Sequence, residues 1–392
     1  MTFLYELINL LVVFSILYIV LIYLKLDLLK SSLLILHLVA IFLLNDVLFP
    51  ASYMADQFRY VDATQAIRKG GDLALMTGAG FSGSIFALTP IPFINSVRSI
   101  AMVNFLIFLF MFTFIKKKKL SSNSVDFFFL LYPSLLLYSS LALRDTLVFL
   151  FMFMSIYFFI IERNYLLCII FSVPLIALKF QNILIFYLSI FVFYFIKGGF
   201  RLYKLVVIAI SLYIFYIMLD IRIERFSLRE IFSIANLEGM RYALFAENYG
   251  YNYTLVSELG YNPVNSIPEF ILVTIKGLFR FILGPFIWAF DNLFQLIQSI
   301  ENIVIIILIT GILFSKKYFK ETREKILFLN LMLLTAFSIY GFVVYNLGSA
   351  ARYKFVFIGV YMILSYCIIE RDHYLARKIC INQDNLIENS VV

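Results

Sequence analysis

The chain has little charge for its length. Only 14% of its 392 residues are charged, 63% are hydrophobic, and the mean hydropathy is +0.95. A soluble domain carries about 25% charged residues, whereas a disordered chain has too few apolar residues to form a core. The composition therefore excludes an ordinary soluble enzyme, a nucleic-acid-binding protein and a disordered chain. It predicts an integral membrane protein that crosses the bilayer many times.

Cysteine and histidine are also scarce. Cys168, Cys367 and Cys380 do not stand at metal-ligand spacing, so we expect neither a disulfide nor a zinc site. Of the two histidines, His37 lies inside an apolar run, where we expect a hydrogen-bonded helix residue, and His373 lies near the C-terminus. The sequence has no Walker A loop, no H-E-x-x-H and no G-x-S-x-G motif. We therefore expect no metal and no cofactor.

Long apolar runs are abundant and predict an all-α polytopic protein, 1–392 forming one transmembrane domain. A membrane-spanning helix needs about 20 apolar residues, which gives about 11 transmembrane helices here, with a range of about 10–12. Met1–Glu6 holds no Lys or Arg and no cleavage motif follows, so we expect the first helix to be retained. The predicted spans are Leu7–Leu24, Leu33–Phe49, Ile100–Ile115, Asp126–Ala142, Thr146–Ile161, Tyr165–Leu178, Asn182–Ile196, Leu205–Leu219, one ending at Phe314, one beginning at Ile326, and Phe355–Ile369.

Lysines beside the span ends predict the orientation, because short loops rich in Lys and Arg stay cytoplasmic. Placing every such group inside puts the N-terminus outside and a 370–392 tail in the cytoplasm. Two long outer loops result, at 50–99 and 220–297. In the second loop, Glu269–Phe290 is apolar but carries Lys276 and Arg280 on one helical face. We expect an interfacial or re-entrant helix there.

The basic residues change type across the predicted membrane. The 18 cytoplasmic ones are 13 Lys and 5 Arg, whereas the 14 outer ones are 10 Arg and 4 Lys. Arginine meets phosphate or carboxylate oxygens in pairs, which lysine cannot do. The outer face is therefore predicted to hold an anionic ligand such as a lipid-linked phosphate, the alternative being pairing with nearby acids. Charges beside hydrocarbon are costly and are the strongest candidates: Arg98, Arg144, Lys179, Arg280 and Arg352.

One segment, Tyr132–Thr146, concentrates this pattern. It is predicted to rise to the outer surface, turn at Arg144-Asp145 and descend at once; the alternative is a plain hairpin turn closed by an Arg144–Asp145 pair. Lys179–Asn182 and Gly348–Lys354 form two further tips, and Gly348-Ser349 could begin a helix with free backbone donors. Together the three tips could surround a pyrophosphate.

The outer loops add residues that suit a sugar ligand. Aromatic rings stack on the apolar faces of sugars, and amides bind their hydroxyls. Asp56, Arg59 and Asp62 stand at i, i+3 and i+6 and could share a helix face. An Arg-Tyr pair recurs in the outer segments. The predicted glycan-binding residues are Tyr249, Tyr251, Asn252, Tyr253 and Arg241.

This layout resembles the Wzy-type O-antigen and oligosaccharide repeat-unit polymerases. Many spans, two sizeable outer loops and outer arginines carry the resemblance, with Tyr132-Pro133, Leu143-Arg144-Asp145 and Gly348…Arg352-Tyr353-Lys354 as its local motifs. It implies transfer of a growing glycan from one undecaprenyl diphosphate to a second lipid-linked repeat unit. The location would be a bacterial inner membrane, with membrane lipid and a chain-length regulator protein as partners and no nucleic acid.

That chemistry assigns roles to the candidates. The departing diphosphate needs cations, and the acceptor hydroxyl needs a carboxylate base. The base would be Asp145, Asp56 or Glu247, in that order. The diphosphate-binding residues would be Arg144, Arg352, Lys179, Arg280, Lys354, Arg59 and Arg98.

Two other functions stay open. A multi-span, polyprenyl-phosphate-dependent glycosyltransferase would normally carry an adjacent acidic pair in its first outer loop, whereas Asp56 and Asp62 are not adjacent. A lipid-linked oligosaccharide flippase should place charges deep within several spans. Here the charges concentrate at the helix tips, which favours an enzyme at the membrane surface.

Overall fold

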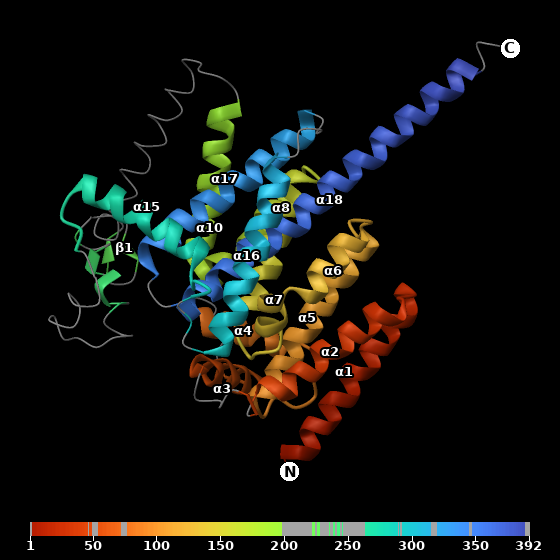
Figure 1. The fold of residues 1–392 in the computed structure, drawn as a ribbon. Helices are drawn as coiled ribbons and strands as arrows, with labels where there is room; N and C mark the ends of the chain where they lie inside the picture. The colour runs from red at the N-terminus through yellow and green to blue at the C-terminus, as the bar shows by residue number, and fades with distance from the viewer. Residues whose placement is uncertain are drawn as a thin grey trace. The chain divides into compact units, whose positions relative to one another are not determined.

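The computed structural model describes residues 2–45, 47–48, 54–71, 77–197, 222–223, 226–227, 235, 238–239, 241–243, 245, 263–288, 290, 292–314, 320–344 and 347–388 (Figure 1). It is the structure of a helical membrane protein. Among the described residues, six helices are long and apolar enough to cross a membrane: Phe3–Leu24, Val97–Lys117, Pro174–Lys197, Leu293–Phe314, Lys320–Val343 and Gly348–Asp372. Two shorter helices, Leu28–Leu44 and Asp145–Ile160, are also apolar.

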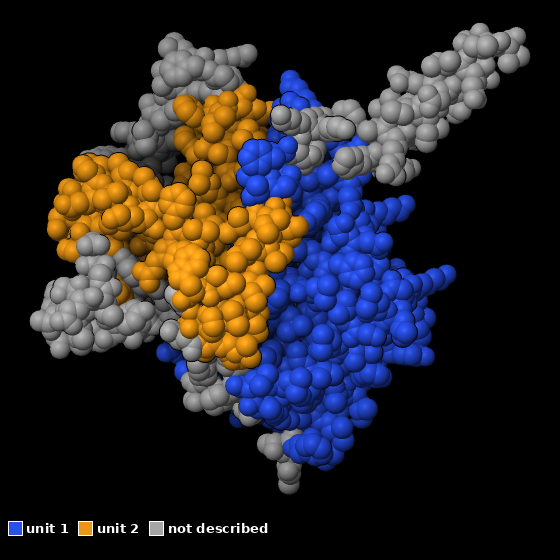
Figure 2. All heavy atoms as spheres, in the orientation of Figure 1, with its two compact units in different colours: residues 1–184, 309–326, 355–392 blue, residues 185–308, 327–354 orange. Residues whose placement is uncertain are grey.

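The chain divides into two compact units, coloured separately in Figure 2. Unit 1 comprises Met1–Leu184, Ile309–Ile326 and Phe355–Val392, and unit 2 comprises Ile185–Leu308 and Leu327–Lys354. Two short strands, β1 (Arg222–Ile223) and β2 (Phe226–Ser227), pair antiparallel in unit 2. The predicted span Leu205–Leu219 lies outside the described residues.

Unit 1 is built from consecutive helices whose starts follow from local sequence. Ser96, Ser122, Thr77 and Asn164 each accept a hydrogen bond from a backbone N–H in the first turn of the helix that follows. Such caps satisfy donors that a helix start leaves free. The helices are α1 (Thr2–Leu24), α2 (Leu28–Leu44), α3 (Asp56–Arg68), α4 (Gly78–Ala87), α5 (Val97–Lys117), α6 (Asn123–Leu131), α7 (Pro133–Ser139), α8 (Asp145–Ile160) and α9 (Tyr165–Ser172). α10 (Pro174–Lys197) begins in unit 1 and belongs to unit 2 from Ile185 onward.

The predicted single helix Asp126–Ala142 is wrong, because the chain breaks between α6 and α7 at Tyr132-Pro133. Proline lacks a backbone N–H and disfavours helical geometry in the residue before it. His37 lies against this break: its Nε2 donates to the Leu130 carbonyl at 2.9 Å, and its ring stacks on Phe108. The expectation that His37 is a hydrogen-bonded helix residue is confirmed.

A second break divides the chain near Lys179. The predicted span Tyr165–Leu178 is two pieces, since α9 ends at Ser172 and α10 begins at Pro174. Within α10 the backbone of Lys179 leaves helical geometry, with φ −164° and ψ 85°. The tip predicted at Lys179–Asn182 therefore coincides with a kink at Lys179, where two helical stretches of α10 meet.

Unit 2 holds α15 (Ile267–Leu283) and parts of α16 (Leu293–Phe314), α17 (Lys320–Val343) and α18 (Leu347–Glu388). α15 crosses α17 backbone to backbone: a Cβ on Gly341 would lie 2.6 Å from the Gly277 carbonyl oxygen. Only glycine at both positions permits this approach. α15 begins after the Ser266 cap and ends at Gly284, and it is not among the helices that could span a membrane.

Candidate functional site

The turn between α7 and α8 is buried. Ser140, Leu141, Ala142 and Leu143 are at most 1% exposed, and Asp145, in the first turn of α8, is 1% exposed. The turn, predicted to lie at the outer membrane face, is packed among the helices of unit 1. A buried, non-helical turn must find partners for its backbone polar groups.

Three amide side chains from three other segments supply those partners. Asn45, at the end of α2, donates to the Ser140 carbonyl at 2.9 Å. Asn104 of α5 donates to the Leu141 and Leu143 carbonyls at 2.6 and 2.7 Å. Gln57 of α3 accepts from the Ala142 N–H at 2.8 Å. We call Asn45, Gln57 and Asn104 the amide clamp, and it sets the backbone that carries Arg144.

Arg144 is a half-buried side chain at the start of α8. No salt bridge or side-chain hydrogen bond joins Arg144 to any other residue in the described part of the chain, so the predicted alternative of an Arg144–Asp145 pair does not apply. Its guanidinium lies across Gly78, the first residue of α4, at a place that a Cβ on Gly78 would occupy. Gly78 therefore sets where the Arg144 charge rests.

The segment of α10 just before its kink also lies beside Gly78 and the Arg144 guanidinium. A Cβ on Gly78 would also meet the Ala177 carbonyl oxygen at 3.2 Å, two residues before Lys179. Lys179 itself is buried, at 8% exposed, and has a partner of its own. The start of α4, the start of α8 and the kink of α10 thus meet around one arginine. Helix starts carry partial positive charge, which favours an anion beside this guanidinium.

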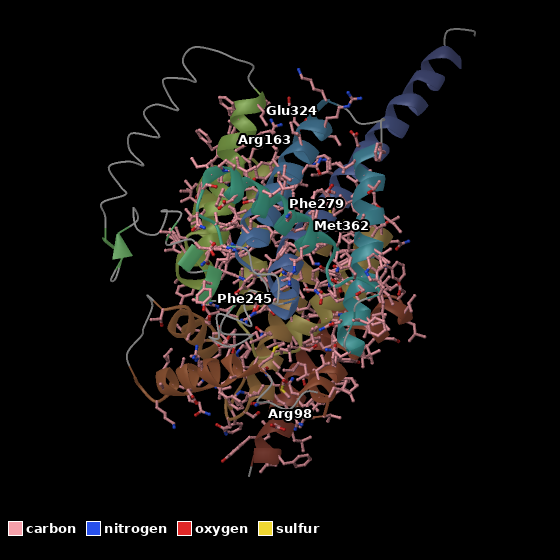
Figure 3. All side chains as sticks on the ribbon, turned by 60° about the vertical axis from the view of Figure 1, so that its left-hand side comes forward. Arg98, Arg163, Phe245, Phe279, Glu324 and Met362 are labelled. Carbon is pink, nitrogen blue, oxygen red and sulfur yellow. The ribbon has the colours of Figure 1, made fainter. Side chains whose placement is uncertain are left out.

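The other candidates of unit 1 have protein partners. Arg98, labelled in Figure 3, donates to Glu6 and to the Asn45 carbonyl, both at 3.2 Å. It therefore also binds the backbone of one member of the amide clamp. Arg59 is 79% exposed and pairs with Asp56 at 3.5 Å, which confirms that these two share a helix face. Surface pairs of this kind stabilise little.

Lys354 is a buried charged residue of unit 2, at 2% exposed. Its ammonium donates to the carbonyls of Phe281 and Gly284 at 3.2 Å each, and to Oδ1 of Asn302 at 2.6 Å. Three donors meet three protein acceptors, so this lysine ties the end of α15 to α16 and α18. As placed, its hydrogens are not available to a diphosphate.

The remaining candidates are dispersed. Arg241 is buried and pairs with Glu238 at 2.8 Å, with its guanidinium over the Phe342 ring. Arg280 is exposed on α15, and Arg352 is half-buried in the first turns of α18. Gly348 and Ser349 lie in the first turn of α18, which begins at Leu347. Glu247, Tyr249, Tyr251, Asn252 and Tyr253 lie outside the described residues.

The sequence analysis missed the amide clamp and Gly78. A signal existed for Asn104, an amide inside the apolar run Ile100–Ile115, because a polar side chain among hydrocarbon must be hydrogen-bonded. Gln57 and Gly78 stand in mixed stretches, where nothing marks them. Among the described residues, no three His, Cys, Asp or Glu side chains gather as metal ligands.

Comparison of the chain with protein-family models, with curated proteins and with solved structures found no match in any of the three.

Proposed function

We propose that the chain polymerises lipid-linked oligosaccharide repeat units into a surface polysaccharide such as O-antigen, at the outer face of a bacterial inner membrane. The helical membrane fold and the unpaired guanidinium of Arg144 support the proposal. About 11 crossings would put the N-terminus outside and the C-terminus in the cytoplasm, with loops 50–99 and 220–297 facing out.

The reaction would be a glycosyl transfer without a metal or a nucleotide. The bond between the anomeric carbon of the growing glycan and undecaprenyl diphosphate breaks, and the diphosphate leaves with the electron pair. A hydroxyl of a second lipid-linked repeat unit forms the new glycosidic bond, and its proton passes to a carboxylate. A chain-length regulator protein would act on the same membrane complex.

Arg144 carries the assignment. Its charge has no carboxylate partner in the described chain and rests beside the start of α4, and the buried turn that precedes it, Ser140–Leu143, is held by three buried amides. A donor that is fixed before charge develops stabilises a leaving oxyanion best. Asp145 is the first candidate for the base because it neighbours Arg144. Asp56 is the second candidate and Glu247, which lies outside the described residues, is the third. Lys179 would add charge from the kink of α10.

The test is Arg144→Ala, examined by the surface-polysaccharide ladder of a strain that depends on this chain. Loss of one preorganised oxyanion donor costs about 10²–10³ in rate, so we expect single-repeat glycolipid at normal protein levels. Arg163→Ala is the matched control, because Arg163 is exposed and pairs with Glu321 on the predicted cytoplasmic side. Long chains from Arg144→Ala would refute the proposal, and precursor trapped in the cytoplasm of a deletion strain would indicate a flippase.

A further inference from the structure

α15 presents three different sectors around its axis. The first packs on the protein: Phe281 is buried against Phe337 and Tyr340, with ring centroids 5.5 and 6.1 Å apart, and Gly277 meets Gly341. These contacts lie on one side of the helix, so the opposite side is free of α17. α15 is therefore anchored along one stripe only.

The second sector is apolar and exposed. Ile271, Ile275 and Phe279 repeat every four residues and are 52%, 48% and 58% exposed, and Leu272 beside them is 52% exposed. Phe279 is labelled in Figure 3. Four half-exposed large apolar side chains in one row form a patch that water does not favour. We call these four residues the apolar row of α15.

The third sector is a basic edge. Lys276 and Arg280 stand one turn apart, directly beside the apolar row, and both are exposed. A helix with a protein-facing stripe, an apolar row and a lysine–arginine edge is typical of segments lying in the plane of an anionic membrane surface. The positive edge complements lipid phosphates, which argues for a bilayer over a second protein.

Trp288 extends the apolar row beyond the end of α15. It is the only tryptophan of the chain, it is 78% exposed, and it stacks on Phe286 with ring centroids 5.0 Å apart. Five residues later α16 begins at Leu293, and α16 is long and apolar enough to span a membrane. An extended residue covers about 3.5 Å at most, so Trp288 lies within about 18 Å of the start of that helix.

Hydrogen bonds fix the C-terminal end of α15 to α16. Asn302 of α16 donates to the Gly284 carbonyl at 2.7 Å, and Lys354 donates to the same carbonyl. The end of α15 is thus fixed to a membrane helix, and tryptophan is enriched where a bilayer meets water.

We propose that α15 lies in the interface of a phospholipid bilayer, with its apolar row and Trp288 among the upper acyl chains and Lys276 at the lipid phosphates. This placement does not depend on the polymerase function. It makes α15 a surface-lying helix bound to anionic lipid.

The single tryptophan allows a direct test in the full-length chain. The protein is reconstituted into phosphatidylcholine–phosphatidylglycerol vesicles whose acyl chains carry bromine at either a shallow or a deep position. We expect blue-shifted Trp288 emission that shallow bromine quenches at least twofold more than deep bromine, with weak quenching by aqueous iodide. Strong iodide quenching without bromine quenching would overturn the proposal, as would maximal quenching by deep bromine, which indicates a spanning helix.

Two sets of variants keep the test decisive. In a Trp288→Phe background, Ile275→Trp should reproduce the shallow quenching, whereas Glu269→Trp, on the polar edge, should be quenched at least twofold less by lipid bromine. Equal quenching of both would remove the apolar row from the interface. Lys276→Glu should at least halve the emission shift caused by added phosphatidylglycerol, and Lys276→Gln should fall between it and the wild type; an unchanged response would refute phosphate binding at this edge.

Discussion

Arg144 and Lys354 are both basic residues beside apolar helices, and their surroundings differ. Lys354 is enclosed, with three protein oxygens around its ammonium and the charge of Glu301 nearby. Arg144 follows a turn that the amide clamp holds, and its guanidinium lies over Gly78 without a carboxylate partner in the described chain. Lys354 holds helices of its unit together through hydrogen bonds, whereas Arg144 is held in place without a carboxylate partner.

The difference separates structural charges from functional ones in a membrane protein. Burying a charge is costly unless it is paired, so an enclosed cation with a full set of acceptors indicates a structural role. A cation that is positioned but has no partner indicates a ligand. Arg68 illustrates the structural case within unit 1, since it donates to the carbonyls of Ala87, Thr89, Ile91 and Pro92.

The largest stability effect should come from Lys354→Met. It removes a buried cation and leaves three acceptors, the Phe281 and Gly284 carbonyls and Asn302 Oδ1, without this donor, and each such loss costs about 1–3 kcal/mol. We expect a strongly lowered unfolding temperature of the purified protein in detergent. Arg144→Met should lower it far less, because no protein partner is lost. The reverse order would break the comparison between the two residues.

Asn104→Leu should come second. It leaves the Leu141 and Leu143 carbonyls buried without donors, at a cost of about 1–3 kcal/mol. Thermal unfolding should shift accordingly, and polymer length should fall because the turn carrying Arg144 relaxes. Leu109→Met, in the same helix, is the volume-matched control and should change neither. An Asn104→Leu variant of normal stability would show that the amide clamp does not hold the turn.

Gly78→Ala should affect activity more than stability. The new methyl group would displace the Arg144 guanidinium, whose flexible end can move aside. We expect about a tenfold lower polymerisation rate, equivalent to about 1.4 kcal/mol, and a smaller loss of stability, because the methyl group would also lie 3.2 Å from the Ala177 carbonyl oxygen. Gly83→Ala is the contrasting variant, because a Cβ there meets the Thr64 backbone at 3.1 Å and should instead lower stability. Normal rates in Gly78→Ala would mean that the position of Arg144 is unimportant.

The smallest effect is expected at an exposed carboxylate that touches neither residue. The hydroxyl of Tyr157, and after it the Lys118 ammonium, lower the pKa of Glu162 below its usual 4.5. The stability that Glu162 adds is therefore fully present at pH values above its usual pKa, and it is lost as the pH falls through the lowered pKa of the folded protein. Glu162→Gln should remove this contribution, which is less than about 1 kcal/mol of unfolding free energy. The unfolding temperature of the variant should therefore fall less steeply between about pH 5 and pH 3. An unchanged pH profile would exclude this pair from the stability of unit 1.

Local sequence accounts for much of the fold. Apolar runs, Ser and Asn caps and the Pro133 break act over a few residues, so they can be recognised without a partner. A helix was predicted within Glu269–Phe290 and is observed at Ile267–Leu283, and the predicted shared face of Asp56 and Arg59 is observed too. The interruption at Lys179 was also predicted, since the apolar runs Tyr165–Leu178 and Asn182–Ile196 stop on either side of it.

By itself the sequence determined that this is a helical membrane protein, and it directed attention to the Arg144 turn. Hydropathy and helical period are properties of neighbouring residues, and they do not change with the fold. Only the tertiary structure decided which cations are neutralised, because Lys354 and Arg98 find partners dozens of residues away. It also revealed the burial of the turn and the clamp of Asn45, Gln57 and Asn104, whose hydrogen bonds join segments 37 to 95 residues apart.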